Sequence, residues 1–263
     1  MEKRLQLSVL FCIIFMHLGF AQVPDSTNHK SVGITGMADR QDPPEYKPKP
    51  RAFIIPAVFV GYGLVSLAGD NPVRRLDFSS KNKLQEDHSR FANHADNFLQ
   101  YAPGVAVFGL NVVGVKGKHS LIDAAGIYVM TGIITGVSVE SVKKITNRQR
   151  PDASNNYSFP SGHTATAFAS AEFLKQEYND VSPLYGVAGY AIATGTGILR
   201  LYNNKHWVSD VVAGAGFGIA STKLAYFLYP KVKKVFTGKG KLNYSLVPSY
   251  QDRVFGLNLN GTF

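Results

Sequence analysis

Six apolar segments constrain the fold of this 263-residue chain more than any other feature. They lie near residues 53–69, 98–115, 121–142, 163–175, 184–200 and 207–229. Each contains enough glycine and alanine to pack closely against a neighbouring helix, and no internal repeat relates them. With 45% hydrophobic residues, the chain can bury one sizeable core. We therefore expect an all-α fold, a helical bundle of about six helices in a single domain.

The first 21 residues have the features of a secretory signal peptide. A short basic start precedes an apolar run over Leu5–Met16, and small residues follow it. An uncleaved anchor helix is the alternative. The only cysteine, Cys12, lies in this segment, so we expect neither a disulfide nor a lipid-modified cysteine in the mature chain. Residues 22–51 are polar and rich in proline, which predicts a flexible linker.

The rest of the chain divides into a helical domain over residues 52–230 and a tail over residues 231–263. Between the first two apolar segments lies a polar stretch with His88 and His94, whose spacing puts them on different faces of a helix. We expect a solvated helix or loop there rather than a metal site. The tail begins with a basic segment and then alternates apolar with polar residues, which predicts a short β-hairpin turning near residues 251–253.

The charge of the chain favours an anionic partner. Its formal net charge is +10 and its isoelectric point is near 9.6, which suits nucleic acid, an anionic membrane surface or a phosphorylated substrate. Export makes nucleic acid the least expected of the three. The sequence also shows no basic stripe interleaved with aromatic residues, no zinc-finger spacing and no recognition helix. We therefore expect no nucleic-acid partner.

The segment FPSGHTATAFAS, residues 159–170, has the features of a helix start that can hold an anion. Pro160 ends the preceding loop, Ser161 is a favoured N-cap, and Gly162 allows a ligand to approach the backbone closely. Free N–H groups and the positive end of the helix dipole would then face a phosphate above Ser161. On these residues alone, an ordinary capped helix with an incidental His163 is an equal alternative.

Charged residues at the ends of neighbouring apolar segments favour the anion site. Lys143 and Arg150 are seven residues apart and would point the same way if one helix persisted between them. After Arg200 come His206 and Asp210, four residues apart, which would share a helix face. The carboxylate could then hold one imidazole nitrogen and leave the other free, as for a nucleophile or base with its orienting group. Taken singly, the three cations are more simply explained as solvated, membrane-flanking or helix-end charges, and the histidine and aspartate as a local hydrogen bond. Their joint position at the ends of successive apolar helices favours the site, because a folded bundle could bring them to one mouth.

Together these residues resemble the three-part signature of the phosphatidic acid phosphatase type 2 and vanadium haloperoxidase superfamily. The signature reads K-x6-R-P, P-S-G-H and S-R-x5-H-x3-D. This chain matches it at Lys143, Arg150 and Pro151, then at Pro160, Ser161, Gly162 and His163, and then at Arg200, His206 and Asp210. At Leu199 the family usually has serine, which puts at most a secondary contact in doubt. The motifs span residues 143–210, and the surrounding helices extend the resemblance to about residues 53–229.

The resemblance implies that residues 52–230 form a catalytic domain with a defined mechanism. His206, neutral and oriented by Asp210, would attack phosphorus and form a phosphohistidine that water hydrolyses. His163 would protonate the leaving oxygen. The phosphoryl oxygens would bind to a cradle made by Lys143, Arg150, Arg200, Ser161 and the Gly162 amide. We expect no metal and no other cofactor, because the three cations supply the positive charge.

Two pKa shifts are expected at such a site. Asp210 should raise the pKa of His206, because a carboxylate favours the charged imidazole. The surrounding cations should lower the pKa of His163. These directions oppose the protonation states that the mechanism needs, since His206 must be neutral and His163 must carry a proton.

The resemblance leaves three activities open. The first is a metal-independent phosphatase of phosphomonoesters or diphosphates, in particular lipid phosphates or isoprenoid diphosphates such as undecaprenyl diphosphate. The second is a broad-specificity, soluble periplasmic acid phosphatase. The third is a vanadium-dependent haloperoxidase, which the short chain disfavours. A non-catalytic phospholipid-binding or scaffold protein is also disfavoured, because both histidines are present.

Location follows from segment length and charge. Several apolar segments approach the roughly 17–25 residues that span a bilayer, although the segment that begins at His163 is too short. If segment 53–69 does not span, the basic loop at residues 116–119 and the basic tail face the cytoplasm, while the anion site faces the periplasm. We therefore expect an exported, periplasm-facing, membrane-associated protein, with a wholly soluble periplasmic bundle as the alternative. The sequence sets no oligomeric state.

Overall fold

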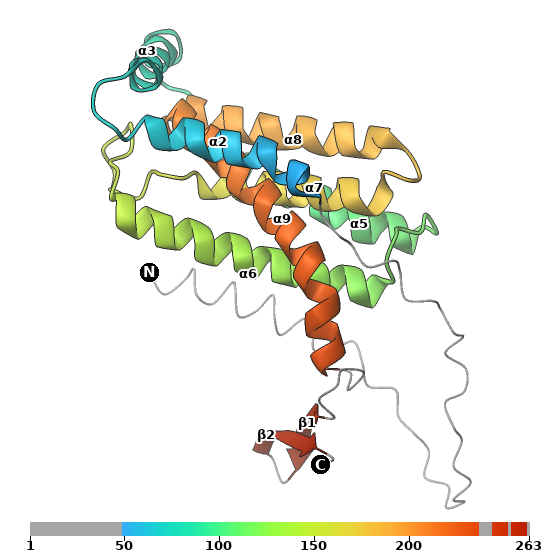
Figure 1. Cartoon of the computed structure of the whole chain (residues 1–263). Helices are drawn as coiled ribbons and strands as arrows, with labels where there is room; N and C mark the ends of the chain where they lie inside the picture. The colour runs from blue at the N-terminus through green and yellow to red at the C-terminus, as the bar shows by residue number, and fades with distance from the viewer. Residues whose placement is uncertain (1–48, 237–243, 252–253, 262–263) are drawn as a thin grey trace, which may run out of the picture. The chain divides into compact units, whose positions relative to one another are not determined.

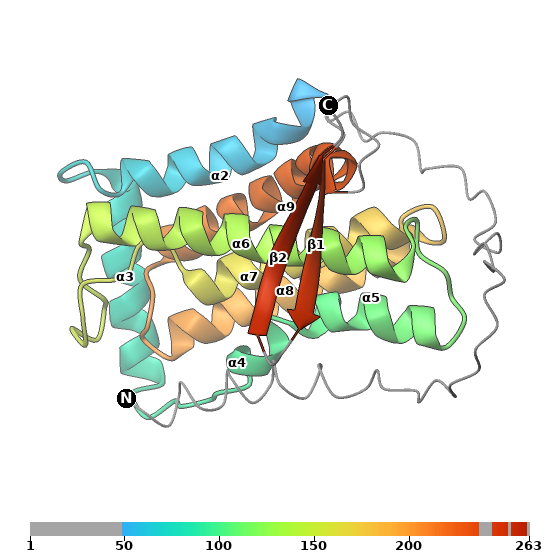
Figure 2. The same ribbon diagram turned by 90° about the horizontal axis from the view of Figure 1, so that it is seen from below.

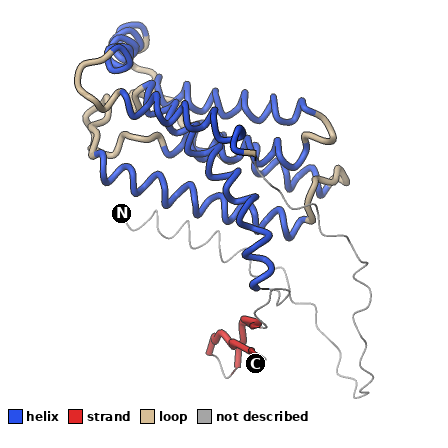
Figure 3. Tube along the Cα trace, viewed as in Figure 1, coloured by secondary structure: helices blue, strands red, loops and turns tan. Residues whose placement is uncertain are grey.

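The computed structural model of the chain describes residues 49–236, 244–251 and 254–261. These residues form helices with connecting loops and, near the C-terminus, a two-stranded hairpin (Figures 1 and 3), which confirms the all-α class. All of them belong to one compact unit, Asp42–Phe263. The predicted signal peptide lies outside the described residues, and so does the predicted linker up to residue 48. The predicted domain boundaries remain predictions.

Eight α-helices occur in the described part of the chain, and six of them coincide with the predicted apolar segments. The elements in chain order are η1 (Pro50–Phe53), α2 (Ile54–Val65), α3 (Pro72–Asp87), α4 (Asp96–Leu99), α5 (Ala102–Val112), α6 (Leu121–Thr146), α7 (Gly162–Tyr178), α8 (Pro183–Tyr202), α9 (Val208–Phe236), β1 (Tyr244–Gln251) and β2 (Val254–Gly261). The two helices that the apolar pattern did not predict, α3 and α4, lie in or next to the polar stretch.

Helix α3 forms from the polar stretch because its start carries two helix-initiating residues. The Asn71 side chain accepts a hydrogen bond from Arg74 N over 2.9 Å, and Pro72 occupies the first helical position, where its missing N–H costs nothing. Most of α3 is exposed, but Asp77 is buried. A solvated helix was one of the two structures expected here, and the buried carboxylate was not expected.

Helix α7 is the centre of the fold and contacts α4, α5, α6, α8 and α9 (Figures 1 and 2). Its contact with α9 is a direct backbone contact. A Cβ atom added to Gly218 would lie 2.1 Å from the Ala165 carbonyl oxygen, and one added to Gly214 would lie 2.6 Å from that of Ser161. Only glycine fits at these two positions, which are four residues apart and so share one face of α9. The start of α7 is thereby fixed next to the first turns of α9.

An apolar cluster joins α5, α6, α7 and α9 further along the helices. It contains Val107, Ile127, Phe173, Tyr178 and Tyr226, all of them almost fully buried. Each large side chain buried in this way stabilises the fold by roughly 1.5–3 kcal/mol. The cluster fixes the helices at a distance from the charged loops described below.

The C-terminal region contains the predicted hairpin. Strands β1 and β2 pair antiparallel, from Tyr244 opposite Gly261 to Gln251 opposite Val254, so residues 252–253 connect them as predicted. Helix α9 continues through Pro230 to Phe236, which places the first basic residues of the predicted tail in its last turns.

Candidate active site

Two loops bring the predicted site residues to one end of the helices. Residues 147–161 join α6 to α7, and residues 203–207 join α8 to α9. Trp207 Nε1 donates to the Gln149 carbonyl over 2.9 Å, and Lys205 pairs with Asp152 at 2.5 Å. The two loops therefore hold each other beside the start of α7.

His163 and the three predicted cations lie in one environment. The pKa of His163 is lowered to about 4, first by burial and then by the positive charge of Arg200, with further contributions from Arg150 and Lys143. The pKa of Arg150 is lowered as well, again first by burial and then by Arg200. The predicted phosphate-binding cations are thus brought together around His163, and the expected direction of its pKa shift is confirmed.

Lys143 and Arg150 reach this environment from different elements. Helix α6 ends at Thr146, because Asn147 adopts a left-handed conformation with φ of 44° and its N–H bonds to the Lys143 carbonyl. The expectation that one helix persists from Lys143 to Arg150 is therefore wrong, and Arg150 lies in the following loop. The Lys143 side chain is buried, and its Nζ donates to the Tyr157 carbonyl over 2.7 Å.

Two guanidinium groups present unused donors. The Nε atoms of Arg150 and Arg200 are buried and have no hydrogen-bond partner among the described residues. Buried polar atoms are nearly always paired, and an arginine has no neutral form to adopt instead. A tetrahedral anion with several acceptor oxygens would satisfy both donors and offset the repulsion between the cations.

The start of α7 has the predicted cap. Ser161 is the N-cap, and its Oγ accepts bonds from Thr164 N at 3.4 Å and from Thr164 Oγ1 at 2.9 Å. Its own N–H donates to the Asp210 carbonyl over 3.0 Å. The hydroxyl and amide of Ser161 therefore already have protein partners. A Cβ atom at Gly162 would lie 3.8 Å from Val139 Cγ1 and 3.9 Å from Lys143 Cε, so a larger residue would meet these two α6 side chains.

His206 and Asp210 are close, but they do not share a helix face. His206 precedes the start of α9 at Val208, whereas Asp210 lies in the first turn and accepts a bond from Trp207 N over 2.9 Å. This backbone bond is the capping-box interaction of a third helical residue with its N-cap. His206 Nδ1 lies 3.4 Å from Asp210 Oδ2, which is longer than a regular hydrogen bond.

Burial decides the charge of His206. Its pKa is lowered to about 4, because the loss of solvation outweighs the opposing effect of Asp210. The expectation that Asp210 raises this pKa is therefore wrong. His206 is only 3% exposed, and removing an imidazolium from water costs more than one carboxylate at 3.4 Å returns. The imidazole is neutral across the physiological range.

Arg148 binds the Asp210 oxygen that does not face His206, and no motif in the sequence singles this arginine out. Its Nη1 donates to Asp210 Oδ1 over 2.8 Å and to Ser209 Oγ over 2.8 Å. Its Nη2 donates to Asp77 Oδ2 over 2.7 Å. Ser158 Oγ donates to the other Asp210 oxygen over 2.5 Å. The Asp210 carboxylate is therefore held by groups from both loops.

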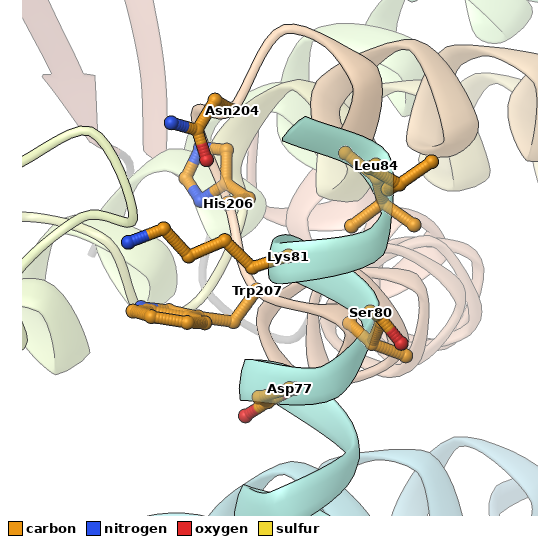
Figure 4. A pocket seen from close by; sticks show the side chains of 9 residues that line it. Asp77, Ser80, Lys81, Leu84, Asn204, His206 and Trp207 are labelled. Atoms are coloured by element: carbon orange, nitrogen blue, oxygen red, sulfur yellow. The ribbon is translucent and has the colours of Figure 1, made fainter. Parts of the chain in front are cut away.

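Helix α3 forms one wall beside His206 (Figure 4). A small pocket is lined by His206, Trp207 and Asn204 on one side and by α3 residues on the other, including Asp77, Ser80, Lys81 and Leu84. Lys81 Nζ lies 5.5 Å from the centre of the Trp207 ring, and Asp77 Oδ1 accepts from Ser209 N over 2.9 Å. The polar stretch that looked like a solvated connection therefore supports the first turn of α9.

Helix α4 supplies two further polar contacts. Asp96 is fully buried and forms an ion pair with Arg200. Asn97 Oδ1 lies 2.8 Å from His163 Nε2. An amide oxygen can only accept, so Nε2 carries the hydrogen and Nδ1 is left for a ligand. Sequence reasoning missed both residues, because they lie more than 60 positions before their partners.

Among the described residues, no group of three or more His, Cys, Asp and Glu side chains is arranged to hold a metal ion. The site consists instead of three cations, two neutral imidazoles and a buried carboxylate. These groups can bind a phosphate, present a neutral nitrogen to phosphorus and move a proton.

The match to known sequences agrees with this arrangement. Residues 121–234 match the profile of the PAP2 superfamily. Curated relatives include two proteins named lipid A 1-phosphatase. The one from Porphyromonas gingivalis is 36% identical over 193 residues, which is 71% of this chain and 40% of the relative. The one from Rhizobium etli is 31% identical over 139 residues, 46% of this chain and 57% of the relative. Residues 121–234 are therefore similar in sequence to the PAP2 superfamily.

The chain thus spans less than two thirds of the length of either relative. Two crystal structures are also similar. One is a transmembrane PAP2-type phosphatidylglycerolphosphate phosphatase from Bacillus subtilis, with a TM-score of 0.44, 21% identity and coverage of 69% of this chain and 96% of that one. The other is LpxE from Aquifex aeolicus, with a TM-score of 0.42, 20% identity and coverage of 55% and 92%.

Proposed function

We propose that this protein is a metal-independent phosphatase that hydrolyses phosphorylated lipids through a phosphohistidine on His206. The observation that carries the proposal is the pair of buried, unpartnered Nε atoms on Arg150 and Arg200, beside His163 and a neutral His206. Such a site suits a phosphate and presents a nucleophile that needs no deprotonation.

In the first step, Nε2 of His206 forms a bond to phosphorus while the bond from phosphorus to the leaving oxygen breaks. Asp210 faces Nδ1 at 3.4 Å and stabilises the positive charge that develops on the ring. Lys143, Arg150 and Arg200 bind the phosphoryl oxygens. His163 gives its proton to the leaving oxygen.

In the second step, a water oxygen attacks phosphorus, its proton passes to His163 and the phosphorus–nitrogen bond breaks. His206 is then neutral again. The low pKa of His163 would leave it without a proton near neutral pH in the free enzyme. A bound phosphate dianion adds negative charge beside it and raises that pKa, so substrate binding itself charges the acid.

The lipid class of the substrate is inferred from relatives and from the surface. The named relatives act on lipid A, which makes a phosphorylated lipid the class to test first. Two helices, Leu121–Thr146 and Val208–Val235, are long and apolar enough to cross a membrane. We infer that the protein is membrane-associated, with α6 and α9 as the candidate spans.

Charge at the two ends of these helices supports a periplasm-facing site. Lys233, near the end of α9, pairs with Asp123 at the start of α6 over 2.9 Å, so these two ends meet away from the site. Lys116 and Lys118 precede α6, and Lys231 and Lys234 flank Lys233. We infer from the positive-inside tendency that this basic end faces the cytoplasm and that the site, whose own cations serve to bind phosphate, faces the periplasm.

The test is trapping of labelled phosphate on the full-length protein in detergent, quenched in alkaline denaturant, with a phosphorylated lipid as substrate. We expect base-stable, acid-labile label on the wild type and none on His206→Ala. Asp210→Asn should retain some label, because the imidazole remains. Label retained on His206→Ala would identify another nucleophile, and a wild type that releases no phosphate from any lipid would reject the activity.

A further inference from the structure

A groove runs along α6 from the proposed catalytic site. Its volume is about 330 Å³, and it begins at Gly162 and His163 at the start of α7. Its walls are α6 from Tyr128 to Glu140, α7 as far as Ser170, and residues 100–101. A substrate held at His163 would therefore extend into this groove.

The α6 wall contains two buried hydroxyl groups without a partner. Thr131 is 1% exposed and Thr135 is 5% exposed, and Oγ1 of each has no hydrogen-bond partner among the described residues. A helical threonine often bonds to the carbonyl four residues earlier, as Thr196 does with Ile192 at 3.0 Å. Leaving a buried hydroxyl unpaired costs free energy, which a ligand with hydrogen-bonding atoms would recover.

Two glycines leave the groove open beside these hydroxyls. A Cβ atom at Gly132 or at Gly136 would meet no atom within 4 Å. Val129, Ile133 and Val137 each follow a groove residue and form a stripe along α6 in which every side chain is more than 60% exposed. The groove thus has hydroxyl groups in its wall and an apolar surface beside it, an arrangement that suits an amphiphile.

We propose that this groove selects phosphorylated lipids whose backbone carries ester, amide or hydroxyl groups over polyprenyl phosphates. The inference rests on the proposed phosphatase function and names its substrate class. The end of the Lys143 side chain lies near Val139, because the Cβ position of Gly162 is 3.9 Å from Lys143 Cε and 3.8 Å from Val139 Cγ1. At 1.5 Å per residue, Thr135 and Thr131 lie roughly 6 and 12 Å along α6 from Val139. The ester, amide and hydroxyl groups of an acylated glycerol or sugar phosphate extend from the phosphate toward these two hydroxyls.

A polyprenyl chain behaves differently in the same groove. It offers only hydrocarbon beyond its phosphate, so both threonine hydroxyls would stay unpaired in the complex. The selectivity therefore arises from the penalty on the wrong substrate as much as from bonds to the right one.

The first experiment compares kcat/KM for three lipids, each divided by kcat/KM for p-nitrophenyl phosphate to cancel any general loss of enzyme. The lipids are phosphatidic acid, an acylated glucosamine 1-phosphate and a polyprenyl phosphate, with full-length protein in detergent. Replacing both hydroxyls by Thr131→Val with Thr135→Val should lower the first two ratios by about tenfold, the scale of one or two lost hydrogen bonds. The polyprenyl ratio should not fall.

Matched controls separate the groove from general effects on helices. Thr196→Val removes a buried hydroxyl outside the groove, on α8. Gly136→Leu should fill the groove and lower the ratio for all three lipids. Gly195→Leu adds the same side chain on α8, outside the groove, at a position where a Cβ atom also meets nothing within 4 Å. This control variant should change none of the three ratios. Equal losses for polyprenyl and acylated lipids in the threonine variant, or no loss at all, would overturn the proposal.

Binding provides a readout that does not depend on turnover. Trp207 is the only tryptophan in the chain and directly follows His206, so its fluorescence should report phosphate arriving at the site. In a titration with each lipid, the threonine variant should bind the acylated lipids about tenfold more weakly and the polyprenyl phosphate unchanged. This pattern without phosphate release would uphold the groove and reject the phosphatase activity. Phosphate release without this difference in affinity would uphold the phosphatase activity and reject the groove.

Discussion

Arg148 and Asp210 form a buried ion pair, with Nη1 2.8 Å from Oδ1. The same guanidinium reaches Asp77 on α3 through Nη2 at 2.7 Å. Because Asp210 also faces His206, the position of the proposed nucleophile depends on Arg148 and Asp77, two residues outside the recognised signature.

Replacing Arg148 should therefore affect both stability and turnover. Arg148→Ala leaves two carboxylates buried without their cation, which we expect to lower the free energy of unfolding by about 3–5 kcal/mol. Arg148→Lys should also lose most of this stabilisation, because a single ammonium does not bridge two carboxylates as a guanidinium does. Denaturant unfolding and kcat, measured on the same preparations, check this.

The matched control for this prediction is Arg75→Ala. Arg75 pairs with Asp70 at 2.9 Å, but both side chains are at least 70% exposed. Such an exposed pair contributes little to the free energy of unfolding, because solvent screens both charges. If Arg148→Ala unfolds no more easily than Arg75→Ala, the buried pair does not support the site.

The role of His163 should depend on the leaving group. Nitrophenolate departs without a proton, whereas an alkoxide does not, so His163→Ala should reduce kcat far more with an alkyl phosphate than with p-nitrophenyl phosphate. A ratio of about 100 between the two losses is the scale of general acid catalysis. Equal losses would make His163 a phosphate ligand or a structural residue.

The pH profile should show the same dependence. In kcat/KM the alkaline limb reports His163 in the free enzyme, where its pKa is about 4. In kcat it reports the complex, where the bound dianion raises that pKa. We therefore expect the alkaline limb of kcat to lie at higher pH than that of kcat/KM with an alkyl phosphate, and to flatten with p-nitrophenyl phosphate. Coincident limbs for the alkyl phosphate would contradict this.

Acid should destabilise the fold through His206. Its pKa falls from an ordinary 6.5 to about 4 on folding, so the unfolded chain takes up a proton first. The stability that comes from the neutral His206 is fully present above pH 6.5 and decreases as the pH falls from 6.5 to 4. The total loss is roughly 3 kcal/mol. The free energy of unfolding of His206→Gln should depend less on pH over this window. Exposed His94→Gln, the control, should follow the wild type.

Chelators should not reduce activity, because the cradle is cationic and its charges come from Lys143, Arg150 and Arg200. Phosphate release after exhaustive treatment with a strong chelator checks this. Activity that disappears and returns with a divalent ion would reject it. Vanadate should compete with the substrate, since it is a tetrahedral anion of similar charge.

The sequence predicted those parts of the fold that depend on local patterns. The six apolar segments became helices, and the Ser161 cap and the β1–β2 hairpin lie where residue types placed them. The local pattern failed where a single backbone conformation decided the outcome. Asn147 turns left-handed, and nothing in the spacing of Lys143 and Arg150 indicates that α6 stops between them.

Partners distant in the sequence could not be predicted at all. Asp77, Asp96 and Asn97 lie in a polar stretch whose composition resembles a solvated surface, yet they contact Arg148, Arg200 and His163. The predicted direction of the His206 pKa shift was wrong for a related reason, because the burial of the imidazole depends on every residue packed around it. The spacing of His206 and Asp210 indicates a nearby carboxylate, but it does not show that the fold excludes water from the imidazole.

The contact of Gly214 and Gly218 with α7 determines how far apart the two histidines are. His163 is anchored to α7 and His206 to the start of α9, and those helices meet through main-chain atoms, without intervening side chains. The separation of the proposed acid and nucleophile is therefore a property of the polypeptide backbone. Side chains elsewhere in the bundle are free to diverge, and the substrate groove can change, while the spacing of the two reacting groups stays the same.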